Sequence, residues 1–182
     1  MILYMWTQEV FQKAIDYAAF AHIQQTVPGK PYSYVVHLAN VSMEVMGAIS
    51  SSNVENPDLA LACAVLHDTI EDTGVTYEDL AVAFGVDVAS GVLALTKNKK
   101  LEGSEKMLDS IARIKKMPRE IGMVKLADRI TNLQKPPAHW KSEKIAKYIE
   151  EAGVILKELA HCNDYLANRL EGKIKEYAKY LN

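Results

Sequence analysis

Side chains that bind metals or move protons follow the longest apolar run of this chain. Leu59–Leu66 is apolar throughout, and the ionisable residues His67, Asp68, Glu71 and Asp72 come soon after it. A helix has about 3.6 residues per turn, so a continuous helix would place Glu71 one turn beyond His67 on the same face. Asp72 would lie one turn beyond Asp68 in the same way. A divalent cation would relieve the repulsion between buried carboxylates, so the segment predicts a buried helix that ends at a metal site.

Two more polar side chains lie in apolar helical patterns elsewhere in the chain. His37 shares a predicted helix face with apolar residues, and Asp128 lies in the apolar frame of another predicted helix. With His67 and Asp68 they form a set of two imidazoles and two carboxylates without a thiolate. These ligands suit Mn²⁺, Fe²⁺ or Zn²⁺. We expect a bound water to be the nucleophile, because such an ion lowers the pKa of water and polarises a phosphoryl oxygen.

Each of these residues also has a purely structural interpretation. His67 and Asp68 alone would fit a histidine at a helix C-terminus beside a solvated carboxylate, and the upstream histidine alone would fit a hydrogen-bonded core residue. Asp128 could form an ion pair with its neighbour Arg129. However, Asp128 shares its helix face with Asn132, whereas Arg129 does not. The presence of the whole set favours the metal site.

The elements that must position these side chains are all predicted to be helices. Apolar residues recur at helical spacing, and no segment shows strand alternation bounded by hairpin turns. The predicted helices cover residues 7–24, 31–50, 57–73, 76–84, 86–95, 104–117, 118–133 and 144–151, with Ser142 as the cap of the last, and one or two more cover 152–180. The predicted fold class is all-α, in a single domain over residues 1–182 with a motif core over about 7–135 and C-terminal helices over 142–182.

Composition and charge limit the classes of function. The chain has 182 residues, is 49% hydrophobic and 24% charged, and has a formal net charge of −2. Neither a disordered chain nor a dedicated nucleic-acid binder, which would carry a strongly basic face, is expected. Residues 1–6 lack the basic start of a signal peptide, and the longest apolar run is too short to span a bilayer. Cys63 and Cys162 have no CxxC spacing, so we expect reduced thiols in the cytoplasm.

The order of the motifs along the chain resembles a known group of hydrolases. An adjacent His-Asp pair with a distant upstream His and a downstream Asp is the pattern of the HD phosphohydrolase superfamily. Further motifs, in the same order, look like the hydrolase domain of the RelA/SpoT family over about residues 7–135. These motifs are Ala21-His22, Gly29-Lys30-Pro31-Tyr32, His37, His67–Thr73, Phe84-Gly85, Leu95–Lys97 and Lys125–Leu133. A lone His-Asp pair is weak support, whereas the ordered set is specific.

The resemblance implies an all-helical HD-domain bundle that removes the 3′-pyrophosphate from guanosine tetra- and pentaphosphate (ppGpp and pppGpp). The products would be GDP or GTP and pyrophosphate, and the usual metal would be Mn²⁺. Glu71 and Asp72 match the pair that orients and activates the attacking water, and Asn132 matches a residue that contacts the ribose. The implied metal ligands are His37, His67, Asp68 and Asp128. Because it ends at residue 182, the chain resembles a stand-alone small alarmone hydrolase of the stringent response.

Two lysines are candidates for binding the substrate. Lys97 follows the Leu-Thr motif, in a loop that would otherwise be a solvated surface. Lys30 follows a segment in which the family usually carries an Arg-Lys pair near the base and the phosphates, whereas this chain has Gln24-Gln25-Thr26-Val27. The identity of the base therefore stays open. Hydrolysis of an adenine alarmone such as ppApp, or removal of the 2′-phosphate of NADPH, would use the same metal site.

Two alternatives are not enzymes. A nucleotide sensor without turnover would be expected to lack a metal ligand or the Glu-Asp pair, and both are present here. A helical protein-interaction domain would explain the fold but not six inward polar residues. The expected partner is a small nucleotide, with no nucleic acid and no membrane, and a homo-oligomer is left open.

Overall fold

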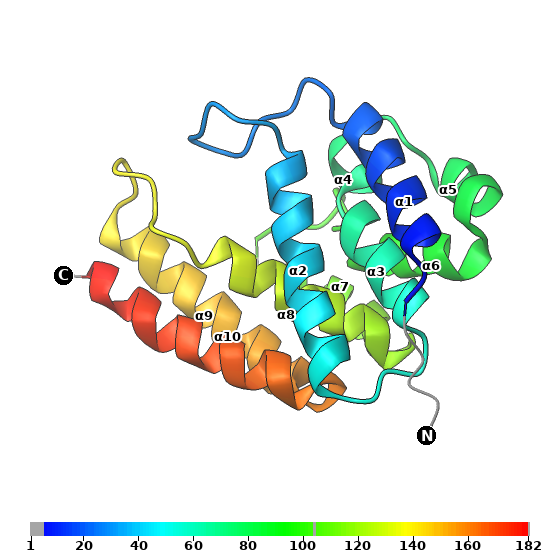
Figure 1. The fold of residues 1–182 in the computed structure, drawn as a ribbon. Coiled ribbons are helices and arrows are strands. Elements are labelled where there is room, and N and C mark those ends of the chain that lie inside the picture. Colours follow the sequence, from blue (N-terminus) through cyan, green and yellow to red (C-terminus); the bar gives the residue numbers. More distant parts are fainter. Residues whose placement is uncertain (1–5, 104, 182) are drawn as a thin grey trace.

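The computed structural model describes residues 6–103 and 105–181, and these residues form helices joined by short loops (Figure 1). The predicted all-α class is confirmed, since the only strand-like pairing among the described residues is an isolated bridge between Thr26 and Ser33. None of the described helices combines the length and the apolar character that crossing a lipid bilayer requires. The helices are α1 (Gln8–Ala21), α2 (Val35–Ser51), α3 (Pro57–Leu66), α4 (Thr69–Asp72), α5 (Tyr77–Phe84), α6 (Val86–Leu95), α7 (Glu105–Ile114), α8 (Arg119–Asn132), α9 (Ser142–Leu159) and α10 (Asp164–Tyr177), with 3₁₀ turns at Ala160–Cys162 and Ala178–Leu181.

The central helix α3 is buried on all sides. Every residue from Leu59 to Leu66 is buried, as expected for a helix without a polar face. Helices α1, α2, α6 and α8 pack around it (Figure 1). Its N-terminus is capped by the Asn56 side chain, which accepts a hydrogen bond from the backbone N–H of Leu59, and Pro57 occupies the first turn. The apolar run therefore forms the framework that carries the polar residues at its C-terminal end.

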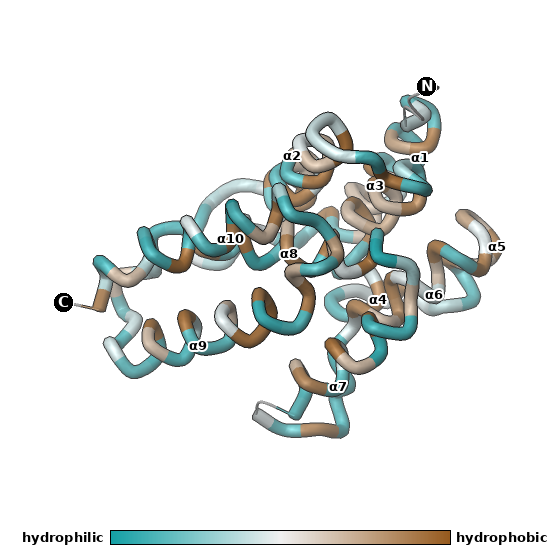
Figure 2. Tube along the Cα trace, turned by 90° about the horizontal axis from the view of Figure 1, so that it is seen from below, coloured by the Kyte–Doolittle hydropathy of each residue, from teal (hydrophilic) through white to brown (hydrophobic). Residues whose placement is uncertain are grey.

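Helix α8 is the second buried helix and connects two parts of the core. Its residues from Glu120 to Thr131 are all buried, and it contacts α2 and α3 on one side and α9 and α10 on the other. Figure 2 shows that α9 and α10 are amphipathic, with hydrophobic and hydrophilic residues mixed along each tube. Asp128 is therefore carried by a helix whose position is set by packing from both sides.

Several predicted helix ends are wrong. The first helix ends at Ala21 rather than Gln24, and the second begins at Val35 rather than Pro31. The intervening segment folds back on itself, because the backbone N–H of Tyr34 donates to the carbonyl of Gln25 beside the Thr26–Ser33 bridge. Helix α7 ends at Ile114, before the predicted end at residue 117, and the predicted start at residue 104 lies outside the described residues. Residues 1–5, on which the expectation about a signal peptide rests, lie outside them too. Ser142 is the first residue of α9 and not its cap.

Helix α8 comes close to the turn after α9 at Gly122, where there is no room for a larger side chain. A Cβ atom at Gly122 would lie 2.3 Å from the Cys162 sulfur and 3.1 Å from its Cβ atom. We therefore expect Gly122→Ala to lower the free energy of unfolding by about 1–3 kcal/mol, as overpacking of cores typically does. Gly153→Ala in α9 is the control, because an added Cβ atom there would meet no described atom outside its own helix turn within 4 Å, and it should stabilise the protein by about 0.5–1 kcal/mol. Urea unfolding measures both, and a neutral or stabilising Gly122→Ala would contradict this packing.

Candidate metal centre and active site

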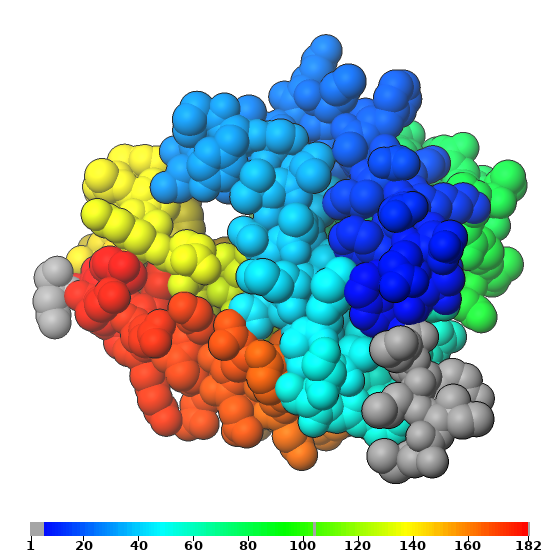
Figure 3. Space-filling model, in the orientation of Figure 1, coloured from blue at the N-terminus to red at the C-terminus, as the bar shows by residue number. Residues whose placement is uncertain are grey.

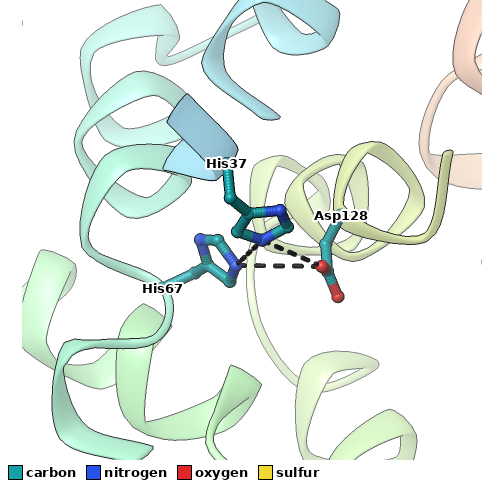
Figure 4. A group of neighbouring side chains, drawn as sticks. All are labelled: His37, His67 and Asp128. Carbon is teal, nitrogen blue, oxygen red and sulfur yellow. Dashed lines mark hydrogen bonds and ion pairs between the residues drawn. The ribbon is translucent and has the colours of Figure 1, made fainter. Parts of the chain in front are cut away.

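Three side chains from separate segments of the chain converge at the C-terminal end of α3. His37 comes from α2, His67 follows α3, and Asp128 comes from α8, and their ligand atoms all lie within 4.8 Å of one another (Figure 4). The two Nε2 atoms are 3.3 Å apart. The Asp128 Oδ1 atom lies 3.6 Å from Nε2 of His37 and 3.8 Å from Nε2 of His67. All three residues are buried, and two imidazoles with a carboxylate fit a divalent metal ion.

The carboxylate of Asp68 faces the same two histidines. Its Oδ2 atom is 2.9 Å from Nε2 of His67 and 3.7 Å from Nε2 of His37. The hydroxyl of Tyr34 donates a hydrogen bond of 2.5 Å to the same oxygen. The structure thus brings all four predicted ligands together, since His37, Asp68 and Asp128 each place an atom within 4 Å of Nε2 of His67. The role of each as a ligand stays a prediction.

The central helix does not continue through the site. It ends at Leu66, and the separate helix α4 begins at Thr69. Two side chains explain the break, because His67 Nδ1 lies 2.8 Å from the carbonyl oxygen of Ala64 and the Thr69 hydroxyl donates to the carbonyl of Leu66. These side chains compete for carbonyls that a continuing helix would use. The prediction of one helix over 57–73 is therefore wrong, and Glu71 does not lie one regular helical turn beyond His67.

The hydrogen bond to Ala64 fixes the tautomer of His67. Because a carbonyl only accepts, Nδ1 carries the hydrogen and Nε2 presents its lone pair to Asp68 and Asp128. Three acceptor atoms then face one another, which requires a cation or a proton between them. Burial lowers the pKa of His67, but the attraction and hydrogen bond of Asp68 and the attraction of Asp128 outweigh it and raise the pKa to about 9. A metal ion would replace that proton.

The carboxylates of the cluster are held in their charged form. Burial alone would raise the pKa of Asp128, but Lys125 and His67 lower it to about 2. The Lys125 ammonium donates to Asp128 Oδ2 at 3.1 Å, and Lys125 is itself buried. Burial would likewise raise the pKa of Asp68, and His67 and Tyr34 hold it well below its usual range. Burial and the neighbouring His67 lower the pKa of His37.

The cluster opens into a polar pocket of about 210 Å³. Glu71, Asp72, Lys97 and Asn132 all line it, as expected for residues of one site, and their roles stay predictions. Both carboxylate oxygens of Glu71 accept hydrogen bonds from Lys97, each at 2.8 Å. Oε2 accepts from the backbone N–H of Lys97, and Oε1 accepts from the ammonium group of Lys97. Asn132 donates from Nδ2 to Asp128 Oδ1. Arg129 points away toward Tyr148 and Glu151, as its helical position predicted.

A second and larger pocket, of about 800 Å³, lies next to the first. His37 and Asn132 belong to its lining, and Asn132 lines both pockets. Figure 3 shows the hollow between the loop after α1, in blue, and the segment before α9, in yellow. Lys30 lies in its wall, and aromatic side chains of Trp140 and Tyr148 line it. Sequence analysis missed both aromatic residues, because nothing in their spacing connects them to the histidine motifs.

Comparison with known proteins gives consistent matches over most of the chain. Residues 14–165 match the family described as HD domain. The Drosophila melanogaster protein named guanosine-3′,5′-bis(diphosphate) 3′-pyrophosphohydrolase MESH1 is 32% identical over 168 residues, which cover 88% of this chain and 90% of that protein. The Homo sapiens protein of the same name is 28% identical, over 90% of this chain and 92% of its own. A solved structure described as a metazoan ortholog of SpoT that hydrolyzes ppGpp is 30% identical, with a TM-score of 0.80 over 94% of this chain and 97% of that one.

Proposed function

The chain belongs to the HD-domain family, and we propose that it is a guanosine-3′,5′-bis(diphosphate) 3′-pyrophosphohydrolase, which converts ppGpp to GDP and pppGpp to GTP with release of pyrophosphate. The observation that carries this proposal is the meeting of His37, His67 and Asp128 at a polar pocket that Glu71 and Asp72 also line. The relatives named for this activity match nearly the whole chain, which supports the same assignment.

The metal ligands of this proposal are the two histidines with Asp68 and Asp128, and the metal is Mn²⁺. The fit is supported by the lone pair of His67 Nε2, which faces two carboxylate oxygens and needs a cation beside it. Nitrogen and oxygen ligands without a thiolate suit Mn²⁺. A divalent ion held here would lower the pKa of a water molecule and polarise a phosphoryl oxygen.

The acidic pair acts on the attacking water. Asp72 takes a proton from the water as its oxygen adds to the phosphorus next to the 3′ oxygen. The bond between that phosphorus and the sugar oxygen breaks, the sugar oxygen takes up a proton from solvent, and pyrophosphate leaves. Glu71 helps to orient the water and holds Lys97 at the pocket, where the ammonium attracts the phosphates.

The larger pocket receives the nucleoside. Its volume of about 800 Å³ is within the range of small-molecule sites, and Trp140 and Tyr148 offer aromatic surface to a base or sugar. Asn132 lies where the two pockets meet, which suits its proposed contact with the ribose. Lys30, which is exposed in the wall of this pocket, is placed to attract the remaining phosphates.

The cytoplasm is the compartment that suits the cysteines. Cys63 and Cys162 are both free and buried. Burial raises the pKa of each thiol, so both stay protonated and unreactive. Free thiols of this kind are typical of proteins in reducing compartments.

The test is pyrophosphate release by the purified chain from ppGpp and from ppApp, each with Mn²⁺ and with a chelator. We expect release from ppGpp that stops with the chelator and returns when Mn²⁺ is added. Phosphate release from NADPH is followed in parallel. A folded, Mn²⁺-loaded protein that leaves ppGpp intact would contradict the proposal, and turnover confined to ppApp or NADPH would redirect it to that substrate.

A further inference from the structure

The side chain of Gln25 bridges a buried histidine and one of the two acidic residues at the pocket. Its Oε1 atom lies 2.6 Å from Nδ1 of His22, and its amide nitrogen donates to Oδ2 of Asp72 at 2.9 Å. His22 is 1% exposed, whereas Gln25 is half-buried at the edge of the site. The bridge spans 47 positions of the chain between Gln25 and Asp72 and ties the loop after α1 to α4.

The bridge has a defined hydrogen-bond direction. Oε1 of Gln25 can only accept, so Nδ1 of His22 carries the hydrogen. Nε2 of His22 is buried and has no hydrogen-bond partner among the described residues, which fits a neutral ring whose single hydrogen is on Nδ1. The amide of Gln25 therefore directs its NH₂ group to Asp72. The reverse orientation would place an amide oxygen against a carboxylate oxygen.

The loop that carries Gln25 also contacts a second carboxylate, that of Asp68, through Tyr34. The carbonyl of Gln25 accepts from the N–H of Tyr34 at 2.9 Å, and the Tyr34 hydroxyl donates to Asp68. The Tyr34 ring lies 5.0 Å from the rings of both His22 and His37. Asp68 and Asp72 are thus both held by donors from the loop between α1 and α2.

We propose that Gln25 is a positioning residue that fixes the Asp72 carboxylate for proton transfer from the attacking water, an inference that rests on the hydrolase function proposed above. The amide occupies Oδ2 and leaves Oδ1 free of any hydrogen-bond partner among the described residues. A neutral amide also orients the carboxylate without neutralising its charge. An arginine or a lysine in the same place would neutralise it. His22 orients the amide in turn, so the direction of the Asp72 oxygen is set by a buried ring.

A double-mutant cycle on kcat for pyrophosphate release tests this role. Gln25→Ala should lower kcat by about 10-fold or more with KM and Mn²⁺ affinity changed less than about twofold, since misplacement of a general base can cost about 100-fold. In an Asp72→Ala background the same change should have no further effect, because Gln25 acts through Asp72. Gln24→Ala is the matched control. Gln24 is exposed and makes no side-chain hydrogen bond in the part of the chain that the structure describes, so its kcat should stay at the wild-type value.

The outcomes separate this inference from the proposed function. A wild-type protein that releases no pyrophosphate refutes the hydrolase. If the wild type is active, the positioning role is overturned when Gln25→Ala keeps the full kcat. It is also overturned when Gln25→Ala lowers kcat by the same factor in the wild type and in the Asp72→Ala background. A second readout needs no activity: ¹⁵N NMR of the histidine rings in the metal-free protein should show His22 with its hydrogen on Nδ1 in the wild type, and this preference should weaken in Gln25→Ala. A hydrogen on Nε2 in the wild type would overturn the bridge itself.

Discussion

Asp128→Asn is expected to weaken Mn²⁺ binding by more than about 100-fold and to lower kcat/KM for ppGpp by a similar factor at limiting metal. Residues that merely support a ligand already contribute about 10–100-fold to metal affinity, so a ligand should contribute more. The substitution keeps the shape of the side chain and its contact with Asn132, but it removes the charge that faces His37 and His67. Isothermal titration of the metal-free protein with Mn²⁺, followed by the pyrophosphate assay, measures both effects.

Stability must be separated from metal binding in this experiment. Asp128→Asn leaves the Lys125 ammonium, with 10% of its side chain exposed, without its carboxylate, which can cost about 3–5 kcal/mol. The double variant Lys125→Met/Asp128→Asn removes the buried pair as a whole, so it should recover most of the stability while Mn²⁺ binding stays weak. Asp109→Asn is the matched control, because Asp109 is half-exposed and, within residues 6–103 and 105–181, its side chain pairs only with Arg113. Wild-type Mn²⁺ affinity in Asp128→Asn would contradict the ligand role.

The metal-free protein is expected to lose about 3 kcal/mol of unfolding free energy as the pH rises from 6.5 to 9. The pKa of His67 is about 9 in the folded protein against 6.5 for the free side chain. The folded state therefore holds a proton that the unfolded state releases, and this stabilisation is complete below pH 6.5 and lost as the pH rises through 9. The pKa of His37 is lowered, so that residue destabilises the fold as the pH falls below 6.5. Maximum stability is expected near pH 6.5.

Urea unfolding across this pH range measures the effect. With Mn²⁺ bound, the free energy of unfolding should instead rise with pH. The metal requires the neutral imidazole, so between pH 6.5 and 9 the Mn²⁺ affinity should rise about tenfold per pH unit with release of about one proton per ion. His139→Gln, which replaces an exposed histidine outside the cluster, should keep the wild-type pH dependence. A flat profile of stability in the metal-free protein, or metal binding without proton release, would show that His67 is not protonated at this site.

Helical periodicity and motif order carried much of the prediction. The all-α fold, the burial of α3 and the inward direction of His37 and Asp128 are confirmed, because a buried face repeats every 3.6 residues whatever the partner helix is. The resemblance to the RelA/SpoT hydrolases is confirmed by matches over most of the chain. The helix predicted over residues 76–84 is also present as α5, and a capping box between Thr76 and Asp79 marks its start.

Two features of the site could not be predicted from periodicity: where a helix breaks, and which residues far apart in the chain come into contact. The break after Leu66 arises where side chains take the carbonyls of Ala64 and Leu66, a choice that periodicity alone does not reveal. The Lys97–Glu71 ion pair spans 26 positions, and the Gln25–Asp72 bridge spans 47. Each depends on where packed helices place the loops between them.

The sequence by itself determined which side chains face the core and which chemistry they could do. It determined a helical protein with imidazoles and carboxylates turned inward. Only the tertiary structure decided that the Asp68 and Asp128 carboxylates both face His67 and that the Lys97 ammonium pairs with the Glu71 carboxylate. It also decided that Trp140 and Tyr148 line a second pocket. The reason is physical: a repeat of 3.6 residues orients a side chain relative to its own helix, whereas the distance between two side chains on different segments depends on how all the helices pack.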